Sequence, residues 1–584
     1  MKTMTKMMKP FPAALAGSVA GCLALALAGA AHAQTASQLT QPSYAPPVVR
    51  PAEGGVSLSG STGADAPAGA EKLSVTPSGL IVDGGWPEFA GETAAIEATL
   101  KGQKVTGADL FAAARRLEEA YTRAGYVLVR VSLPPQTIRN GKPLRLVVTD
   151  GQIEAVDVSA LPARVQGHVR TVIAPLAGKP RVTQAELERR LLLAGDTPGL
   201  ILRSTLKAGT QPGTTVIVVD GRHDAISATV TMDNSTGKDL GGYTAGLGVD
   251  FNSLLGFGET AYLRANGYPG LDGGAFSDDP RNRQLIAGVT VPLGGTGAWA
   301  NVEAVDSRTH PKSELPFTML DRYQRFSARL GYSWIRSRSL NTSSVLAFDA
   351  GEETLKLDLG TARTDFAQDR LRVLRLTQTA DAFLPWEGRL NGSITASFGL
   401  DGLGARQGTS ALPMTRLGAK PDFRKLDVTA GYTQPLFSNR VYLSLAAKAQ
   451  TSFGEALVSS EQFGLGGADW VSAYRGGQFQ GDSGAAFRSE VSLPVALPSF
   501  AMLPDLGSAV MPYLFAAGGF VKLEKPSAVE KEYLSAGAFG AGLRVALSQK
   551  ATPHSGSLSL EYARGGARQQ KPEDRINFRL ALKY

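Results

Sequence analysis

Regular alternation of apolar and polar residues dominates the chain from about residue 223 to its end. In RINFRLALKY (575–584), every second side chain is apolar or aromatic, and the intervening positions are mostly Arg, Asn and Lys. The segments SLSLEY (557–562) and RFSARLGYSW (325–334) follow the same period of two. This pattern predicts β-strands with one apolar and one polar face, and the Gly, Asp, Asn, Ser and Pro between the segments predict turns.

Sixteen such segments can be counted. They begin near residues 226, 243, 258, 284, 297, 322, 341, 369, 388, 424, 440, 484, 509, 533, 555 and 574. Strands of about 9–11 residues cross a bilayer at a tilt, and an even number closes an antiparallel barrel without an unpaired edge. A soluble sandwich would show the same alternation with its apolar face buried, so the pattern alone does not separate the two folds. The N-terminal leader, the absence of cysteine after residue 33, the number of segments and the terminal aromatic residue together favour the membrane barrel.

Residues 76–150 combine helical and strand periods. Thr106 is expected to cap a helix with one apolar stripe, which Gly125 ends, and strands are expected at 126–133 and 144–151. These elements predict a small α/β module.

Residues 151–222 repeat this plan without repeating its letters. A strand is expected over Ile153–Val158, a helix after Thr183, and further strands over 200–209 and 214–221. The chain therefore has two α/β modules followed by a barrel over 223–584.

The first 33 residues have the organisation of a secretory signal peptide. Three lysines precede an apolar run, and Ala31-His32-Ala33 predicts cleavage after Ala33. A lipoprotein motif ending at Cys22 is an alternative, although the apolar run continues beyond it. Cleavage after Ala33 removes the only cysteine. Residues 34–75, rich in Pro, Gly, Ser and Ala, are expected to form a flexible linker or a short plug segment.

Composition adds little about partners. The net charge of +8 includes three leader lysines, and no run of Lys and Arg is concentrated enough to indicate nucleic-acid binding. Beyond the leader, no stretch of about 18 apolar residues predicts a membrane-spanning helix.

The tetrapeptide GDSG (481–484) is similar to the nucleophile loop of trypsin-like proteases. A nucleophilic serine needs a neighbouring base, and none of the five histidines lies in the sequence context of that family. No catalytic constellation, cofactor motif or metal-ligand cluster stands out, so an enzyme is the last choice. Asp482 and Ser483 are interpreted as turn residues.

Two stretches carry a family resemblance. In 117–153, the helix followed by GY, P-x-Q and L-x-L-x-V-x-x-G is similar to the first periplasmic module of the two-partner-secretion transporters (TpsB, ShlB/FhaC/HecB type), which belong to the superfamily of BamA. The matching residues are Tyr121, Gly125, Tyr126, Pro134, Gln136 and Gly151. In 463–491, WVSAYRGG, GDSG and R-x-E resemble the loop motif of the same family and the strand after it. The matching residues are Val471, Ser472, Ala473, Tyr474, Arg475, Gly476, Gly481, Asp482, Gly484 and, on the lumen wall, Arg488 and Glu490.

The resemblance implies two α/β POTRA modules followed by a 16-stranded antiparallel transmembrane β-barrel. It implies a Gram-negative outer membrane, with the POTRA modules in the periplasm and a long loop (453–483) folded into the lumen. The implied function is secretion of an unfolded partner exoprotein (TpsA) of the haemolysin or adhesin type. Outer-membrane lipid and the barrel-assembly machinery are the other implied partners, without nucleic acid or cofactor. An assembly factor of the same superfamily is the alternative, although it would be expected to have at least three modules, and a plain porin would have none.

The loop departs from the family pattern at two positions. Ser472 stands where the family has Arg, and Ala517 stands where related barrels have the Asp that pairs with it. Loss of both partners avoids an unpaired charge in a crowded lumen. The hypothesis for this chain is that Arg475 anchors the loop instead, against Glu490 or another acid.

Overall fold

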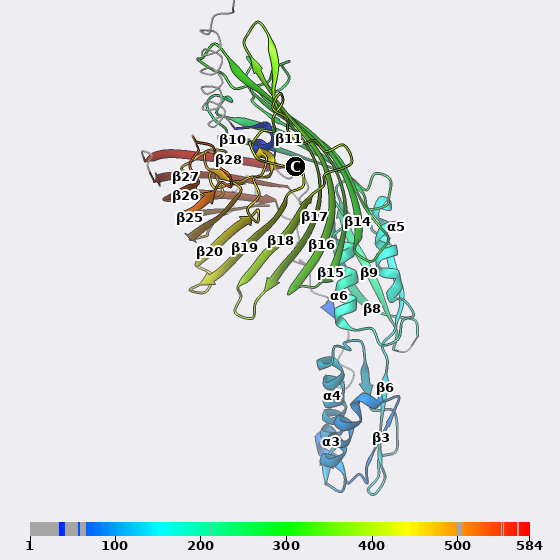
Figure 1. Cartoon of the computed structure of the whole chain (residues 1–584). Helices are drawn as coiled ribbons and strands as arrows, with labels where there is room; N and C mark the ends of the chain where they lie inside the picture. Colours follow the sequence, from blue (N-terminus) through cyan, green and yellow to red (C-terminus); the bar gives the residue numbers. More distant parts are fainter. Residues whose placement is uncertain are drawn as a thin grey trace, which may run out of the picture.

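The computed structural model describes residues 34–40, 57–58, 66–211, 213–498, 505–528, 530–549, 552, 554–568 and 572–584. Within them, two α/β modules precede a closed β-barrel, and the modules extend from one end of it (Figure 1). The predicted leader, its cleavage site and most of the predicted linker lie outside the described residues.

The first module packs two helices, α3 (Ala90–Leu100) and α4 (Gly107–Arg123), against a three-stranded sheet. The strand order is β3 (Leu80–Asp83), β6 (Leu144–Thr149), β5 (Arg130–Ser132). The smaller elements are η1 (Ala70–Lys72), β2 (Ser74–Val75), η2 (Pro87–Phe89) and β4 (Val105–Thr106). Helix α4 begins with the predicted capping box, in which the Thr106 hydroxyl accepts from the Asp109 amide at 3.2 Å and the Asp109 carboxylate accepts from the Thr106 amide at 2.8 Å.

Residues of the module-one motif support this core. Tyr121 is 1% exposed, and its hydroxyl accepts a hydrogen bond from the Trp86 amide at 3.0 Å. Burial raises the pKa of Tyr121. The side-chain amide of Gln136 hydrogen-bonds to β6 in the way a neighbouring strand would. It accepts from the Arg145 amide at 2.9 Å and donates to the Arg145 carbonyl at 2.7 Å. Pro134 lies beside it, with its carbonyl 3.4 Å from the Gln136 amide nitrogen.

Glycine is required at two positions of the same motif, for different structural reasons. Gly125 follows α4 with a φ of 94°, a conformation that favours glycine. Gly151 has no room for a side chain, because a Cβ there would lie 1.9 Å from the carbonyl oxygen of Leu128. Both explanations concern the folding of the module rather than contact with a partner.

The second module has the same layered plan. It consists of β7 (Ile153–Ala160), α5 (Ala163–Ile173), η3 (Ala174–Leu176), α6 (Gln184–Gly195), β8 (Leu200–Ala208) and β9 (Thr215–His223). Its sheet has the order β1-β8-β9-β7, in which β1 (Ser57–Leu58) comes from the segment before the first module and pairs in parallel with β8. The side chains of α5 and α6 share one buried core with this sheet.

Sixteen antiparallel strands form the barrel, which confirms the predicted number. They are β10 (Ile226–Asp233), β11 (Thr244–Asn252), β12 (Thr260–Gly267), β13 (Asn282–Pro292), β14 (Ala298–Thr309), β15 (Thr318–Arg336), β16 (Leu340–Asp358), β17 (Arg363–Phe383), β18 (Arg389–Gly399), β19 (Arg424–Leu436), β20 (Val441–Thr451), β23 (Ser483–Ser492) continued by β24 (Val495–Leu497), β25 (Leu506–Lys522), β26 (Tyr533–Gln549), β27 (Ser555–Ala567) and β28 (Glu573–Lys583). The largest shift from a predicted start is at β17, which begins at Arg363 rather than near 369.

Closure joins the first strand to the last. β10 and β28 pair from Thr229 opposite Lys583 to Asp233 opposite Arg579. The terminal residue extends this pairing, since Tyr584 and Ala228 exchange two backbone hydrogen bonds of 2.9 Å.

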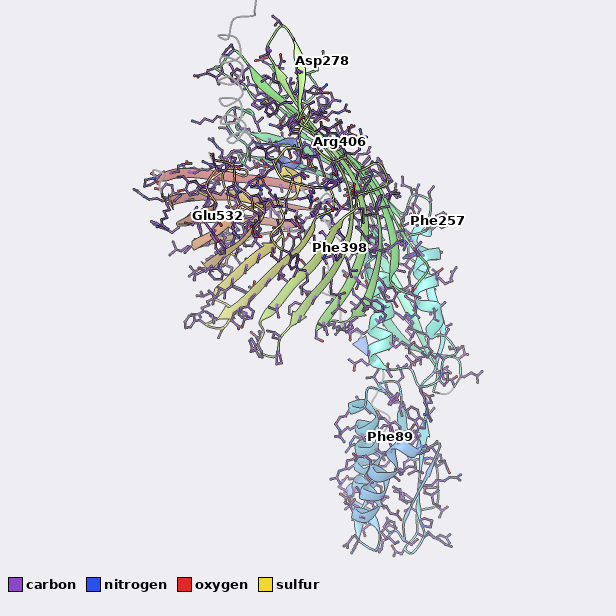
Figure 2. All side chains as sticks on the ribbon, in the orientation of Figure 1. Phe89, Phe257, Asp278, Phe398, Arg406 and Glu532 are labelled. Carbon is purple, nitrogen blue, oxygen red and sulfur yellow. The ribbon has the colours of Figure 1, made fainter. Side chains whose placement is uncertain are left out.

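The faces of the strands are those of a membrane barrel. On β15, Phe326, Leu330 and Trp334 are 50–59% exposed, and Phe398 on β18 is also on the outside (Figure 2). Arg325 and Arg329 point inward, where each guanidinium forms an ion pair with the buried Glu303. The apolar faces are therefore left for lipid and the polar faces for the lumen.

The second module is fixed to the barrel by polar contacts. Asp196, at the end of α6, accepts from the Arg336 guanidinium on β15 at 2.7 and 2.8 Å. Arg189 of α6 donates to the backbone carbonyls of Ser333 and Trp334 at 2.6 and 3.0 Å. Among the described residues, no helix is long and apolar enough to cross a membrane.

Replacing Gly151 by alanine is expected to destabilise the periplasmic region by about 2 kcal/mol, because the added methyl group collides with backbone. Gly91→Ala, at an exposed site in α3 with open space around it, is the matched control and is expected to stabilise by about 0.5 kcal/mol. Urea unfolding of a fragment spanning residues 66–223, which contains both module cores, would measure the two effects. Equal unfolding midpoints for the two variants would contradict the assignment.

Candidate functional site: the barrel lumen

The connection between β20 and β23, residues 452–482, folds back inside the barrel (Figure 1). It contains η4 (Ser459–Glu461) and a two-stranded ribbon of β21 (Phe463–Gly464) and β22 (Gln480–Gly481). Val471, Tyr474 and Phe479 are at most 1% exposed and share an apolar cluster with wall residues of β23, β25, β26 and β27. The lumen thus has a packed interior on this side.

Wall glycines make room for the loop. A Cβ at Gly565 on β27 would lie 2.6 Å from the Cβ of Ala473 and 2.7 Å from the Tyr474 ring. A Cβ at Gly519 on β25 would lie 2.6 Å from the Leu465 side chain. The loop and the wall therefore fit closely enough for one added methyl group to separate them.

Asp482 holds the base of the loop. This residue is fully buried, and its carboxylate forms an ion pair with the Arg416 guanidinium from the β18–β19 connection. It also accepts from the amides of Leu457 and Glu524 at 2.9 and 2.6 Å, and from the Gln462 side chain at 3.3 Å. Asp482 does lie in a bend, between β22 and β23, and it has a further role that the sequence did not indicate, since it joins several connections of the barrel.

Glu461 provides a second charged attachment. The Arg375 guanidinium of β17 approaches it at 2.5 Å and the Lys425 ammonium of β19 at 3.0 Å. Both cations project from the wall, whereas the acid belongs to the loop. These buried charges are paired, as low-dielectric surroundings require.

Residues 34–40 also lie in the lumen, in the segment expected to be a linker or plug. Its short helix α2 (Ala36–Leu39) contacts β14, β15 and η4. The Ala36 amide donates to Asp321 at 2.6 Å, the Ser37 amide donates to Glu353 at 3.3 Å, and the Gln38 side chain donates to Gln480 of the loop at 2.7 Å. The segment and the loop therefore form one connected filling.

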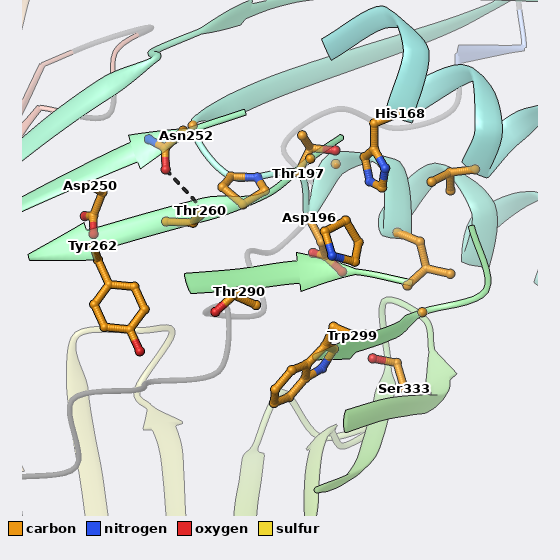
Figure 3. A pocket seen from close by; sticks show the side chains of 18 of the residues that line it. His168, Asp196, Thr197, Asp250, Asn252, Thr260, Tyr262, Thr290, Trp299 and Ser333 are labelled. Carbon is orange, nitrogen blue, oxygen red and sulfur yellow. Dashed lines mark hydrogen bonds between the residues drawn. The ribbon is translucent and has the colours of Figure 1, made fainter. Parts of the chain in front are cut away.

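A cavity of about 420 Å³ lies where the second module meets the barrel (Figure 3). The barrel contributes polar and aromatic side chains, including Tyr262 and Trp299, and the module contributes His168 and Leu193. Burial lowers the pKa of His168, while nearby Glu259 opposes this effect. The lining combines apolar surface with hydrogen-bonding groups.

Residues 213–545 match the family described as haemolysin secretion/activation protein ShlB/FhaC/HecB, and residues 88–151 match the POTRA domain of the ShlB type. The chain belongs to the ShlB/FhaC/HecB family. It is a TpsB-type outer-membrane β-barrel with periplasmic POTRA modules, as the resemblance implied.

Individual relatives are distant. The heme/hemopexin transporter protein HuxB of Haemophilus influenzae (strain 86-028NP) is 29% identical over 176 residues, which cover 30% of this chain and 31% of HuxB. The outer membrane transporter CdiB of Dickeya dadantii (strain 3937) is 23% identical over 376 residues and 64% of each chain. The alignments thus span less than two thirds of either relative.

Solved structures agree on the fold. CdiB from Escherichia coli superimposes with a TM-score of 0.68 at 19% identity, covering 98% of both chains. CdiB from Acinetobacter baumannii gives a TM-score of 0.59 at 17% identity, again over 98% of both chains.

The family motif of the loop can now be followed in space. Val471, Ser472, Ala473 and Tyr474 are buried against the wall, and Gly476 lies beside Gln34, whose side-chain nitrogen would be 2.9 Å from a Cβ at this position. Gly481 and Gly484 stand on either side of Asp482–Ser483, where a Cβ would meet backbone of Lys522 and Phe520, respectively. The motif residues therefore lie close together against the barrel wall, but the predicted anchoring of the loop through Arg475 is a separate question.

The hypothesis that Arg475 anchors the loop on Glu490 is wrong. Glu490 on β23 is paired with Arg544 of β26 at 2.8 Å and lies 3.6 Å from Arg488. No ion pair within 4.0 Å joins Arg475 to an acid among the described residues. The buried charged attachments are instead Glu461 and Asp482, which the family motif did not single out as anchors. An exposed ion pair also joins Asp469 of the loop to Arg579 of β28 at 3.2 Å.

Asp482→Asn is expected to lower the stability of the folded barrel by about 3 kcal/mol, because it leaves the buried Arg416 guanidinium with only the more distant, partly exposed Glu530 at 3.8 Å as a counter-charge. Urea unfolding in detergent micelles, followed by heat-modifiable mobility in gels, would measure the loss. Ser483→Ala, at the neighbouring residue whose hydroxyl contacts Ser452 at 3.1 Å, is the control and should change stability by less than about 1 kcal/mol. Similar midpoints for both variants would contradict the role of Asp482.

Proposed function

We propose that this protein is an outer-membrane pore that secretes a partner exoprotein in unfolded form by two-partner secretion. The observation that carries the proposal is a closed barrel of the ShlB/FhaC/HecB family whose lumen is filled by segments of its own chain and whose end carries two POTRA modules. A porin needs no such modules. A barrel with a purely structural role needs no lumen from which the filling segments move to open a path. The names of HuxB and CdiB, both described as transporters, support the same activity.

The modules are proposed to capture the passenger through their sheets. In the first module, β5 pairs with β6 on one side only among the described strands, and it is three residues long. An extended chain can add to such an edge through main-chain hydrogen bonds, which ask little of the passenger sequence. The pairing of β1 with β8 in the second module is an example of such strand addition within this chain.

The cavity at the junction is proposed as the passage from the modules to the lumen. Its apolar lining from α5 and α6 suits the side chains of an unfolded chain, and the hydrogen-bonding groups from the strands suit its backbone. The passage needs no pocket for one residue type, because an unfolded chain presents different side chains to it one after another. Directed transport then depends on folding of the exoprotein outside the cell.

Lipid and the assembly machinery are proposed as the remaining partners. The exposed apolar residues of the strands form the lipid contact, and insertion of a barrel of this size is assigned to the barrel-assembly machinery of the host.

Secretion should depend on this protein in a host that expresses a candidate exoprotein. The expected result is exoprotein in the medium only when this chain is present, with unchanged amounts of other outer-membrane barrels. Immunoblots of medium and membrane fractions measure both. If other barrels fall while no exoprotein is exported, the protein is an assembly factor of the same superfamily.

Ser333→Trp is expected to reduce secretion at least several-fold, because Ser333 lines the junction cavity and the indole would fill part of it. Leu330→Trp is the matched control, since Leu330 lies on the same strand but is 55% exposed on the outer face. Membrane levels of both variants are compared with those of the unmodified protein. Equal secretion by the two variants would contradict the proposed passage.

A further inference from the structure

Arg488 on β23 occupies the point where the loop meets three wall strands. It is 7% exposed, and its guanidinium approaches Glu561 of β27 at 2.5 Å and Glu490 of its own strand at 3.6 Å. The same group lies 3.9 Å from the ring centroid of Phe515 on β25. Arg488 is therefore fixed by the wall, whether or not the loop is present.

The loop uses this fixed cation as a hydrogen-bond donor. One guanidinium nitrogen of Arg488 lies 3.3 Å from the Trp470 carbonyl oxygen and 3.4 Å from the Ser472 hydroxyl oxygen. On the other side of Ser472, the Asn577 side chain of β28 donates to its carbonyl at 2.9 Å. At this point the wall supplies the donors and the charge, and the loop supplies neutral acceptors.

At position 517 the wall carries no acid that could pair with a loop-borne cation. Ala517 on β25 pairs directly with Arg488, and it packs against the apolar cluster that contains Val471 and Ala473. The charge that balances the site comes from Glu561, which also accepts from the Tyr513 hydroxyl at 2.8 Å. Ser472 and Ala517 are thus both neutral, and neither adds a charge that needs a partner.

Departure of this part of the loop leaves no buried charge without a partner, because the nearby ion pair of Asp469 with Arg579 of β28 is exposed to water. Arg488 loses two long hydrogen bonds to neutral groups but keeps both carboxylates of the wall. Glu561 even has an oxygen, Oε1, that lacks a hydrogen-bond partner among the described residues. An ion pair between loop and wall would behave differently, since breaking it strands two desolvated charges.

We propose that Arg488 is the latch that holds the loop in the lumen, and that the latch is neutral on the loop side. Arg488 is a positioning residue: it stays bound to the wall through Glu561 and Glu490 and releases Trp470 and Ser472 when the pore opens. In this contact the charged group is the Arg488 guanidinium of the wall, and the group on the loop is the neutral hydroxyl of Ser472. The proposal concerns opening of the pore and needs no passenger for its test.

The test is the conductance of purified full-length variants in planar lipid bilayers. Arg488→Gln is expected to raise the open fraction about tenfold, and Ser472→Ala about threefold, because each removes hydrogen bonds to the loop. The double variant should open no more than Arg488→Gln alone, since both changes remove the same contact. A full additional increase in the double variant would overturn the proposal.

Arg544→Gln is the matched control. Arg544 also pairs with Glu490 and lies 4.1 Å from the ring centroid of Tyr513, yet within the described part of the chain it makes no hydrogen bond or ion pair to the loop. Its loss should raise the open fraction less than twofold, on the scale of a lost wall contact. Equal conductance of Arg544→Gln and Arg488→Gln would show that any missing wall charge opens the pore, and the latch would be rejected.

Arg488→Lys covers the case in which Arg488→Gln does not fold. Lysine keeps the charge for Glu561 but not the planar, multi-donor geometry, so an intermediate open fraction is expected with unchanged heat-modifiable mobility. Conductance equal to that of the unmodified protein, in a folded Arg488→Lys barrel, would overturn the proposal. Secretion assays are not needed, so failure of the latch and failure of the secretion function are distinguishable.

Discussion

Satisfaction of backbone hydrogen bonds inside lipid is the constraint on which this structure depends. A sheet that faces hydrocarbon has no water to pair with its edges, so its first and last strands must meet. Here they do so through β10 and β28, and the pairing continues to the last residue, Tyr584. The even strand number, the outward apolar faces and the inward polar faces all follow from that closure.

A closed barrel of sixteen strands encloses a space that side chains alone do not fill. This chain fills much of it with its own backbone, in the loop 452–482 and in residues 34–40. The glycines at 519 and 565 show that the wall is shaped for this filling. The filling is connected, because Gln38 of the first segment bonds to Gln480 of the loop. Opening a path through the pore therefore concerns both segments together.

The strand pattern was predictable because a period of two is local and every strand repeats it. Helices α3 and α5 were not predicted, because their sequences carry weak local signals. The α3 sequence AGETAAIEATL buries only Ile96 and Leu100, so it has no broad apolar stripe, and α5 begins after a proline without a capping side chain. The strand expected over 126–133 shortened to Arg130–Ser132, since Tyr126 and Val129 form a turn instead.

The anchors of the loop depend on contacts between distant parts of the chain, which a linear pattern does not contain. Asp482 stands in a turn-like sequence, and its partner Arg416 is 66 residues away. Arg475 has the right residue type in the right motif, but Glu490 is already bound by residues of the wall. The lumen charges as a group follow this rule, as Arg325 and Arg329 share Glu303, and Arg375 joins Asp349 to Glu461.

The pairing of the lumen charges affects how strongly the wall can bind a polypeptide that passes through the pore. Charges that already have partners on the wall do not bind a passing polypeptide strongly, yet they keep water and polar groups in the pore. Two buried acids, Glu461 and Asp482, join the loop to the rest of the barrel by charge. Exposed ion pairs add to them, from Glu455 to Lys525 and from Asp469 to Arg579, whereas Ser472 itself is held through its neutral hydrogen-bonding groups. The middle is therefore the part that can leave without separating buried charges, because its one ion pair, Asp469 with Arg579, is exposed to water, while Glu461 and Asp482 remain fixed to the barrel.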